Sequence, residues 1–112
     1  MEKLYDKVNQ LIDLLEVLSI EVLENDYEEY DQNIVKFTEE MIDTFPRIIK
    51  SYTLPEFEAV ASDVTYWSSQ LEQLLLIFQS PDQFKFIDTM NFETKENLIL
   101  YKEMIKDMEI AV

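Results

Sequence analysis

The chain has 112 residues, 47% of them hydrophobic, which suffices for one domain with its own core and argues against intrinsic disorder. It contains no histidine and no cysteine, which excludes disulfides, the usual zinc sites, and Ser-His-Asp or Cys-His catalytic groups. A net charge of −15 argues against binding to nucleic acid or anionic membranes, since phosphate contacts need lysine and arginine.

Glycine is absent as well. Phosphate-binding loops and nucleophile elbows rely on glycine at positive φ, so the chain should instead form long helices joined by short turns. The first ten residues, MEKLYDKVNQ, lack the basic and apolar regions of a signal peptide. Apolar runs such as LLLIF at 74–78 are too short to span a membrane. We therefore expect no membrane partner and a cytoplasmic protein.

The first predicted helix spans about residues 3–24. Its apolar residues recur every three or four positions and form one stripe that should face the core: Leu4, Val8, Leu11, Leu15, Leu18 and Val22. Asn25 suits the left-handed position that often ends a helix. Asp26 should cap the next helix, with Glu29 completing a capping box. A tight turn between antiparallel helices is therefore expected here.

The second predicted helix begins at about Tyr27. Its stripe consists of Tyr27, Tyr30, Ile34, Phe37, Met41, Phe45, Ile48 and Tyr52. Pro46 lies inside this pattern. Because proline removes a backbone donor and clashes with the preceding turn, we expect a kink near Asp43 or a break.

The sequence TLPE at 53–56 predicts the next boundary. Thr53 should cap a third helix, with Pro55 in its first turn and Glu56 closing a capping box. Tyr52 and Phe57 are placed to pack across this boundary as a hydrophobic staple. The third stripe is Phe57, Val60, Val64, Trp67, Leu71, Leu74 and Phe78, in which Trp67 should anchor the core.

The sequence SPDQ at 80–83 should begin a fourth helix, with Ser80 as its cap and Pro81 at its first position. The stripe of this segment is Phe84, Ile87 and Met90. Its extension meets Asn91 and Thr94, which are polar and suited to capping, so we expect a break or sharp bend near residues 91–94. The stripe resumes with Leu98, Tyr101, Ile105 and Met108, and the last helix should run to about Ile110.

Amphipathic helices, short turns and the lack of a strand pattern predict an all-α protein. We expect a single domain over residues 1–112, an up-down antiparallel four-helix bundle whose last helix is broken near residues 91–94.

One end of this bundle should carry more apolar side chains than a core requires. The segments LLEVLSIEVL at 14–23 and LLLIF at 74–78 are apolar on more than one face. Two explanations remain open: the helix at 81–90 folds across this end, or the surplus binds a partner helix or a second copy. The candidate binding residues are Val17, Ile20, Leu23, Glu24, Tyr27, Glu28, Asp31, Leu76, Ile77, Phe84 and Phe86.

Acidic residues border the same end. Eight acids and no basic residue lie between Lys7 and Lys36. Solvated helix faces account for many of them, whereas Glu24, Glu28 and Asp31 form a collar beside the apolar end. The segment DYEEYD at 26–31 lacks the turn glycine of a calcium loop, so no metal site is assigned.

These features favour a non-enzymatic interaction module of the adaptor, chaperone or inhibitor type. Its unknown protein partner should be basic or an amphipathic helix, because charge steers the encounter and apolar groups hold the complex. We assign no catalytic residue and no cofactor. One alternative is a nucleic-acid mimic that inhibits a DNA- or RNA-binding protein. The other is a structural bundle whose role is self-association, for example as a homodimer.

Overall fold

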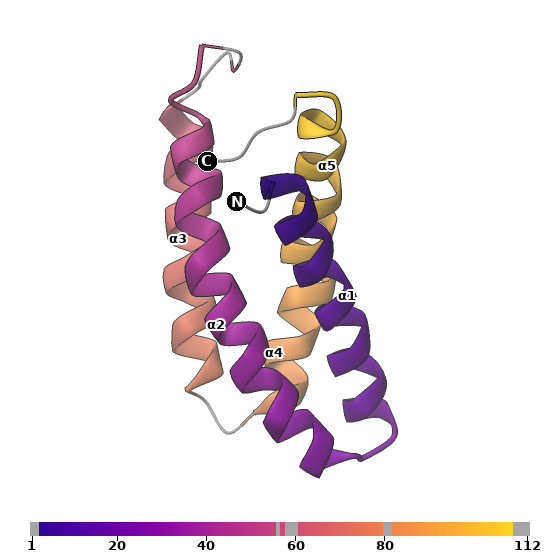
Figure 1. Ribbon diagram of the computed structural model, residues 1–112. Helices are drawn as coiled ribbons and strands as arrows, with labels where there is room; N and C mark the ends of the chain where they lie inside the picture. The colour runs from indigo at the N-terminus through magenta and orange to yellow at the C-terminus, as the bar shows by residue number, and fades with distance from the viewer. Residues whose placement is uncertain (1–2, 56, 58–60, 80–81, 109–112) are drawn as a thin grey trace.

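The computed structural model describes residues 3–55, 57, 61–79 and 82–108 (Figure 1). The regular elements in these ranges are all helices: α1 (Leu4–Leu23), α2 (Tyr27–Ser51), α3 (Ala61–Phe78), α4 (Gln83–Thr89), the π-helical segment η1 (Met90–Thr94) and α5 (Lys95–Ile105). The last three follow one another directly and together form the fourth helix, which packs against α1 and α3 (Figure 1). The predicted all-α, up-down four-helix bundle is confirmed.

The core consists of the apolar stripes that the sequence predicts. Every residue of the α1 stripe is buried, as are the α2 stripe residues from Tyr30 to Tyr52. Trp67 is the expected anchor and is only 3% exposed, with its ring edge-on to Phe45 and Tyr101. Tyr27 is the exception in its stripe because it lies on the surface at the start of α2.

The turn between α1 and α2 closes with backbone hydrogen bonds around Asn25, whose φ of 58° confirms the predicted left-handed position. The Asn25 amide donates to the Val22 carbonyl (3.2 Å) and the Asp26 amide to the Glu21 carbonyl (2.8 Å), the pair of bonds of a Schellman motif. Asp26 caps α2 as expected, since its Oδ1 accepts from the Glu29 amide at 3.4 Å. The second half of the predicted capping box is wrong: the Asp26 amide donates to the backbone carbonyl of Glu21 and not to the side chain of Glu29.

Pro46 lies inside α2, which continues to Ser51, so of the two predicted alternatives, a kink near Asp43 or a break, the break is wrong. A proline at this position removes one hydrogen bond, to the Ile42 carbonyl. Met41, Phe45 and Ile48 are buried on both sides of it, and their packing holds the helix together.

The TLPE sequence ends α2 instead of beginning α3. The Thr53 hydroxyl donates to the Lys50 carbonyl at 2.7 Å, on the C-terminal side of α2, and α3 begins only at Ala61. Phe57 therefore precedes the helix, although its ring contacts Tyr52 as predicted, with centroids 5.1 Å apart. Glu56 and Val60 lie outside the described residues.

The start of α4 also differs from the prediction by two residues. Asp82 is the cap, since its Oδ1 accepts from the Lys85 amide at 3.0 Å, and the helix begins at Gln83. Ser80 and Pro81, the predicted cap and first residue, lie outside the described residues. At the other end of the fourth helix, α5 stops at Ile105 and residues 106–108 form turns, so the predicted helix does not continue through them, and Ile110 lies outside the described residues.

The predicted break near residues 91–94 is the π-helical segment η1, in which the chain remains helical. Four buried residues follow one another at spacings of four, two within this segment and one on each side of it: Phe86, Met90, Thr94 and Leu98. In an α-helix each such step turns about 40° beyond a full circle, so three steps would carry the stripe out of the core. The wider π turn absorbs the excess. Thr94 does not cap a helix, because its hydroxyl donates to Gln70 Oε1 at 2.7 Å.

Candidate functional site

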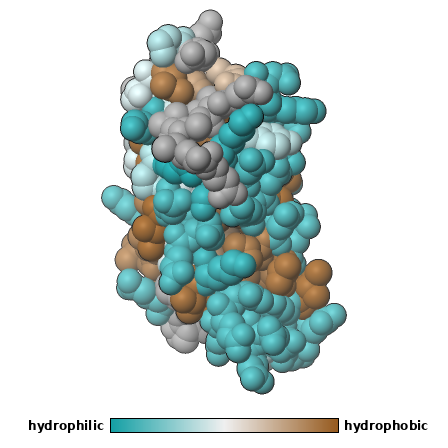
Figure 2. Space-filling view, in the orientation of Figure 1, coloured by the Kyte–Doolittle hydropathy of each residue, from teal (hydrophilic) through white to brown (hydrophobic). Residues whose placement is uncertain are grey.

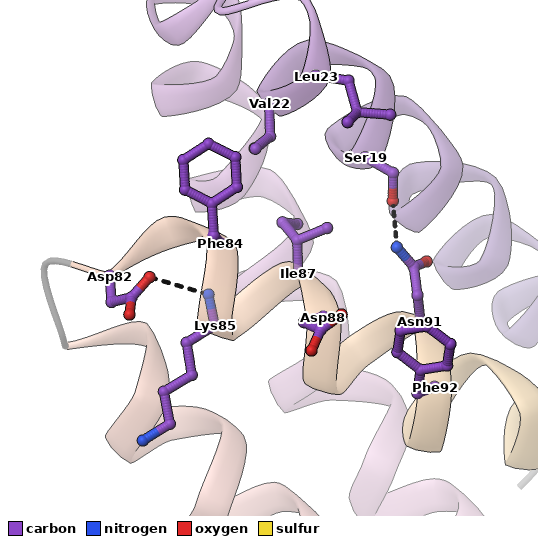
Figure 3. A pocket seen from close by; sticks show the side chains of 10 residues that line it. All are labelled: Ser19, Val22, Leu23, Asp82, Phe84, Lys85, Ile87, Asp88, Asn91 and Phe92. Carbon is purple, nitrogen blue, oxygen red and sulfur yellow. Dashed lines mark hydrogen bonds between the residues drawn. The ribbon is translucent and has the colours of Figure 1, made fainter.

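Two adjoining hollows lie between α1 and the fourth helix. The first, of about 640 Å³, is lined by Ser19, Val22, Leu23, Asp82, Phe84, Lys85, Ile87, Asp88, Asn91 and Phe92 (Figure 3). The second, of about 530 Å³, is lined by Glu16, Ser19, Ile20, Asn91, Lys95, Glu96 and Ile99. Because they share Ser19 and Asn91, the two hollows form one continuous surface, which we call the α1–α4 groove.

Large apolar side chains line this groove and remain open to solvent. Their exposed fractions are 78% for Leu23, 75% for Phe92, 58% for Phe84, 53% for Ile20 and 37% for Ile99. In Figure 3, Phe84 and Leu23 extend from opposite helices on either side of the buried Val22 and Ile87. Isolated exposed apolar residues need no explanation, but a contiguous set on facing helices is typical of a binding surface.

Polar contacts cross the groove between its two hollows. The Ser19 hydroxyl donates to the Leu15 carbonyl at 2.8 Å and accepts a hydrogen bond from Asn91 Nδ2 at 2.7 Å. About one helical turn after Asn91, at the start of α5, Lys95 Nζ lies 3.4 Å from a Glu16 carboxylate oxygen. These contacts tie α1 to the fourth helix and hold the groove in shape.

Three of the residues proposed from the sequence line the groove: Ile20, Leu23 and Phe84. Val17 is exposed but lines a separate hollow between α1 and α2. Leu76 is exposed and Ile77 half-buried near the end of α3, away from the groove lining. Figure 2 shows the resulting brown patches on α1 and α3 in the lower half of the view.

Phe86 belongs to the core rather than to a binding surface. It is 2% exposed, and its ring packs edge-on to Phe37 with centroids 6.4 Å apart. Phe84 was expected in the core stripe instead. The two residues point about 200° apart around a helix, so only one can face the core. The segment α4 continues into the fourth helix, leaving Leu23 and Phe84 exposed, so it does not fold across and cover this end.

The predicted acidic collar lies at the α1–α2 turn. Glu24, Glu28 and Asp31 are all exposed, and none of them lines the groove. Near them Glu21 is buried, with Oε1 accepting from Asn33 Nδ2 and Oε2 without a partner among the described residues.

The electrostatics of this corner favour neutral side chains. Burial raises the pKa of the Glu21 carboxyl above its ordinary value, the Asn33 hydrogen bond opposes this, and the charges of Asp26 and Glu29 add to the rise. Burial, with the charges of Asp31 and Glu21, also raises the pKa of Tyr30 to about 12. The corner thus combines exposed charge with buried groups that resist ionisation.

The residues of the groove that were not proposed from the sequence include Ser19, Asn91, Phe92 and Ile99. For the three on the fourth helix, the available signal was the series of four-residue spacings from Phe86 to Leu98, which suits a continuous helix with a π turn rather than a cap. Once the segment is helical, Asn91 faces α1 and Phe92 lies beside it (Figure 3).

The described residues contain no group of three acidic, histidine or cysteine side chains able to hold a metal ion. Among them, no helix has the length and apolar character needed to cross a membrane. No protein-family model, curated protein or solved structure matches the chain.

Proposed function

We propose that the protein is a non-enzymatic interaction module that binds a basic amphipathic helix of a partner protein in the α1–α4 groove. The observation that carries this proposal is the contiguous row of exposed Leu23, Phe84, Phe92, Ile20 and Ile99 between two helices. From residue 84 to residue 99 the fourth helix is about 24 Å long, which matches four to five turns of a bound helix.

Charge complementarity supports a basic partner. The groove is lined by four carboxylates and two lysines, and because Glu16 and Lys95 pair with each other, Asp82, Asp88 and Glu96 remain against Lys85. The whole chain carries −15, so a basic segment is attracted from a distance. A second copy of the chain is a less favourable occupant, because two strongly acidic molecules repel each other.

A binding role without catalysis agrees with the side chains present. The sequence has no histidine or cysteine, and the groove offers apolar contact area bordered by carboxylates. These are the components of an interface, in which buried apolar residues supply affinity and peripheral charges supply the rate of encounter.

The test uses a designed amphipathic peptide of about 16 residues, with leucines on one face and lysines on the other. Titration calorimetry compares the wild-type protein with Phe92→Ser in the groove and Leu100→Ser on α5. Leu100 is the matched control, since it is 65% exposed but lines neither hollow. We expect saturable binding that Phe92→Ser weakens about tenfold or more and Leu100→Ser leaves unchanged.

Equal affinity of the two variants would overturn the proposal, since it would mean that the peptide binds through charge alone. The proposal would also be overturned if the peptide did not bind, or if light scattering showed a homodimer of the wild type that Phe92→Ser dissociates. Each variant is checked by circular dichroism so that a loss of binding is not confused with a loss of fold.

A further inference from the structure

We infer that Asn91 determines which helices the α1–α4 groove accepts: it selects a partner helix with a hydrogen-bond donor between two apolar side chains seven or eight residues apart. This inference rests on the proposed function. It concerns Ser19 and Asn91, whose side chains are hydrogen-bonded across the middle of the groove.

The hydrogen bonds of Ser19 fix the orientation of the Asn91 amide. The Ser19 hydroxyl proton is used on the Leu15 carbonyl (2.8 Å), so its oxygen can only accept from Asn91. The atom facing Ser19 must therefore be Nδ2, which leaves Asn91 Oδ1 as the free end of the side chain. Figure 3 shows this oxygen turned away from Ser19, and it accepts no hydrogen bond from the described residues.

In the empty groove, water can hydrogen-bond to the unpaired carbonyl oxygen of Asn91. An entirely apolar partner helix would displace this water at a cost in binding free energy. Asn91 is already half-buried, and a bound helix would remove its remaining water. Without a donor on the partner, Oδ1 would lose its hydrogen bonds to water and gain none. A donor opposite Asn91 removes this penalty, so the residue discriminates between otherwise similar helices.

The positions of the two hollows set the spacing of the apolar side chains. The first hollow is lined by fourth-helix residues 82–92 and the second by 91–99, so their midpoints along this helix are about eight residues, or about 12 Å, apart. On a partner helix, positions i and i+7 or i+8 lie on one face and span about that distance. The donor then belongs at i+3 or i+4, opposite Asn91.

The test uses two forms of the leucine–lysine peptide that differ at one central position. One form carries glutamine, which supplies an N–H donor, and the other carries methionine, which has similar size and no donor. Keeping the donor neutral leaves the peptide charge unchanged, so global attraction to the acidic protein is the same for both. Affinities are measured for the wild type, Asn91→Ala and Asn91→Leu. Both substitutions leave the Ser19 hydroxyl bonded to Leu15.

The wild type is expected to bind the glutamine peptide about three- to tenfold more tightly than the methionine peptide. Asn91→Ala should remove this preference, and Asn91→Leu should reverse it in favour of methionine. If the peptides bind in a Phe92-dependent manner but the preference is the same in all three proteins, the role of Asn91 is overturned and the proposed function stands. If neither peptide binds the wild type, the proposed function itself fails.

Discussion

The two ends of the bundle use their aromatic residues in opposite ways. At the closed end, where α2 and α5 finish, rings contact one another with centroids 5.1–6.4 Å apart. These rings belong to Phe45, Tyr52, Phe57, Tyr66, Trp67 and Tyr101. At the open end, beside the α1–α4 groove, Phe84 and Phe92 are exposed. Apart from buried rings such as those of Phe37 and Phe86, the aromatic residues toward the open end are thus available for binding, whereas those at the closed end stabilise the fold.

Hydrogen bonding shows a similar contrast, apart from the buried Thr44 hydroxyl beside Phe45, which has no partner among the described residues. At the closed end Trp67 Nε1 donates to the Tyr52 hydroxyl at 3.2 Å, and the Tyr101 and Ser51 hydroxyls are hydrogen-bonded to each other. At the open end Glu21 Oε2 is buried without a partner in the described residues, and Asn91 Oδ1 is unused. Satisfied buried polar groups rigidify a core, whereas free acceptors at a surface can serve recognition. Stability and recognition are therefore separated along the molecule.

The strongest test of this separation replaces one large aromatic residue at each end. Trp67→Ala removes a buried ring from the closed end and should cost about 3–5 kcal/mol of unfolding free energy. Phe92→Ala removes an exposed ring and should change it by less than about 0.5 kcal/mol. Urea denaturation followed by circular dichroism measures both. A comparable loss for Phe92→Ala would show that the open end is part of the stabilising core.

A second test compares two completely buried threonines. Thr94→Val removes the donor to Gln70 Oε1 in the buried middle of the bundle and should cost about 1–3 kcal/mol. Thr44, next to Phe45, has a hydroxyl oxygen without a partner in the described residues, so Thr44→Val should be neutral or stabilising by about 1 kcal/mol. The urea midpoints of the two variants, each compared with that of the wild type, measure these changes in stability. If both substitutions destabilise equally, Thr44 makes a hydrogen bond that matters at the closed end.

The smallest expected effect concerns Glu21 at the open end. Because burial raises the folded-state pKa of its carboxyl above 4.5, the protonated form contributes stability at low pH, and this is lost as pH rises through the raised pKa. Glu21→Gln cannot ionise and should be more stable than the wild type near neutral pH by up to about 1 kcal/mol. The advantage should shrink as the pH falls toward 4.

The matched control for Glu21 is Asp31→Asn, which removes an exposed carboxylate near the same turn. It should change the unfolding free energy by less than about 0.5 kcal/mol. Thermal unfolding of the three proteins at several pH values measures the difference. A pH-independent gap between wild type and Glu21→Gln would mean that the raised pKa of Glu21 is not its cause.

The sequence was sufficient to predict the architecture because periodic apolar stripes report directly on burial. Buried apolar residues recur from Leu4 to Val22 in the first helix and from Tyr30 to Tyr52 in the second. The repeat is long enough to identify the face of each helix that points to the core. The short α4 has only about two turns, so neither Phe84 nor Phe86 is favoured by repetition. Its face was decided by packing against Phe37, which lies 49 residues away from Phe86 in the sequence.

The groove was predicted only in part for a related reason. Exposed Leu23 and Ile20 follow from the second apolar face of α1, which is visible in the sequence. Asn91 and Thr94 have side chains that suit either a helix cap or a contact between helices. The choice depends on Ser19 and Gln70, which belong to other helices. Such long-range partners are set by the tertiary structure and are not encoded in local spacing.

The π-helical segment η1 also makes the fourth helix respond differently to the loss and the gain of one residue. Deleting one residue between Met90 and Thr94 would change the core spacings from four, four and four to four, three and four, which an ordinary α-helix accommodates with Leu98, Tyr101 and Ile105 still facing the core. Inserting one residue would instead rotate everything that follows by about 100°, so that these three residues would turn out of the core and Ile99 would leave the groove. The segment therefore already contains the one extra residue that the fourth helix can hold while the closed end and the binding groove stay in phase with each other.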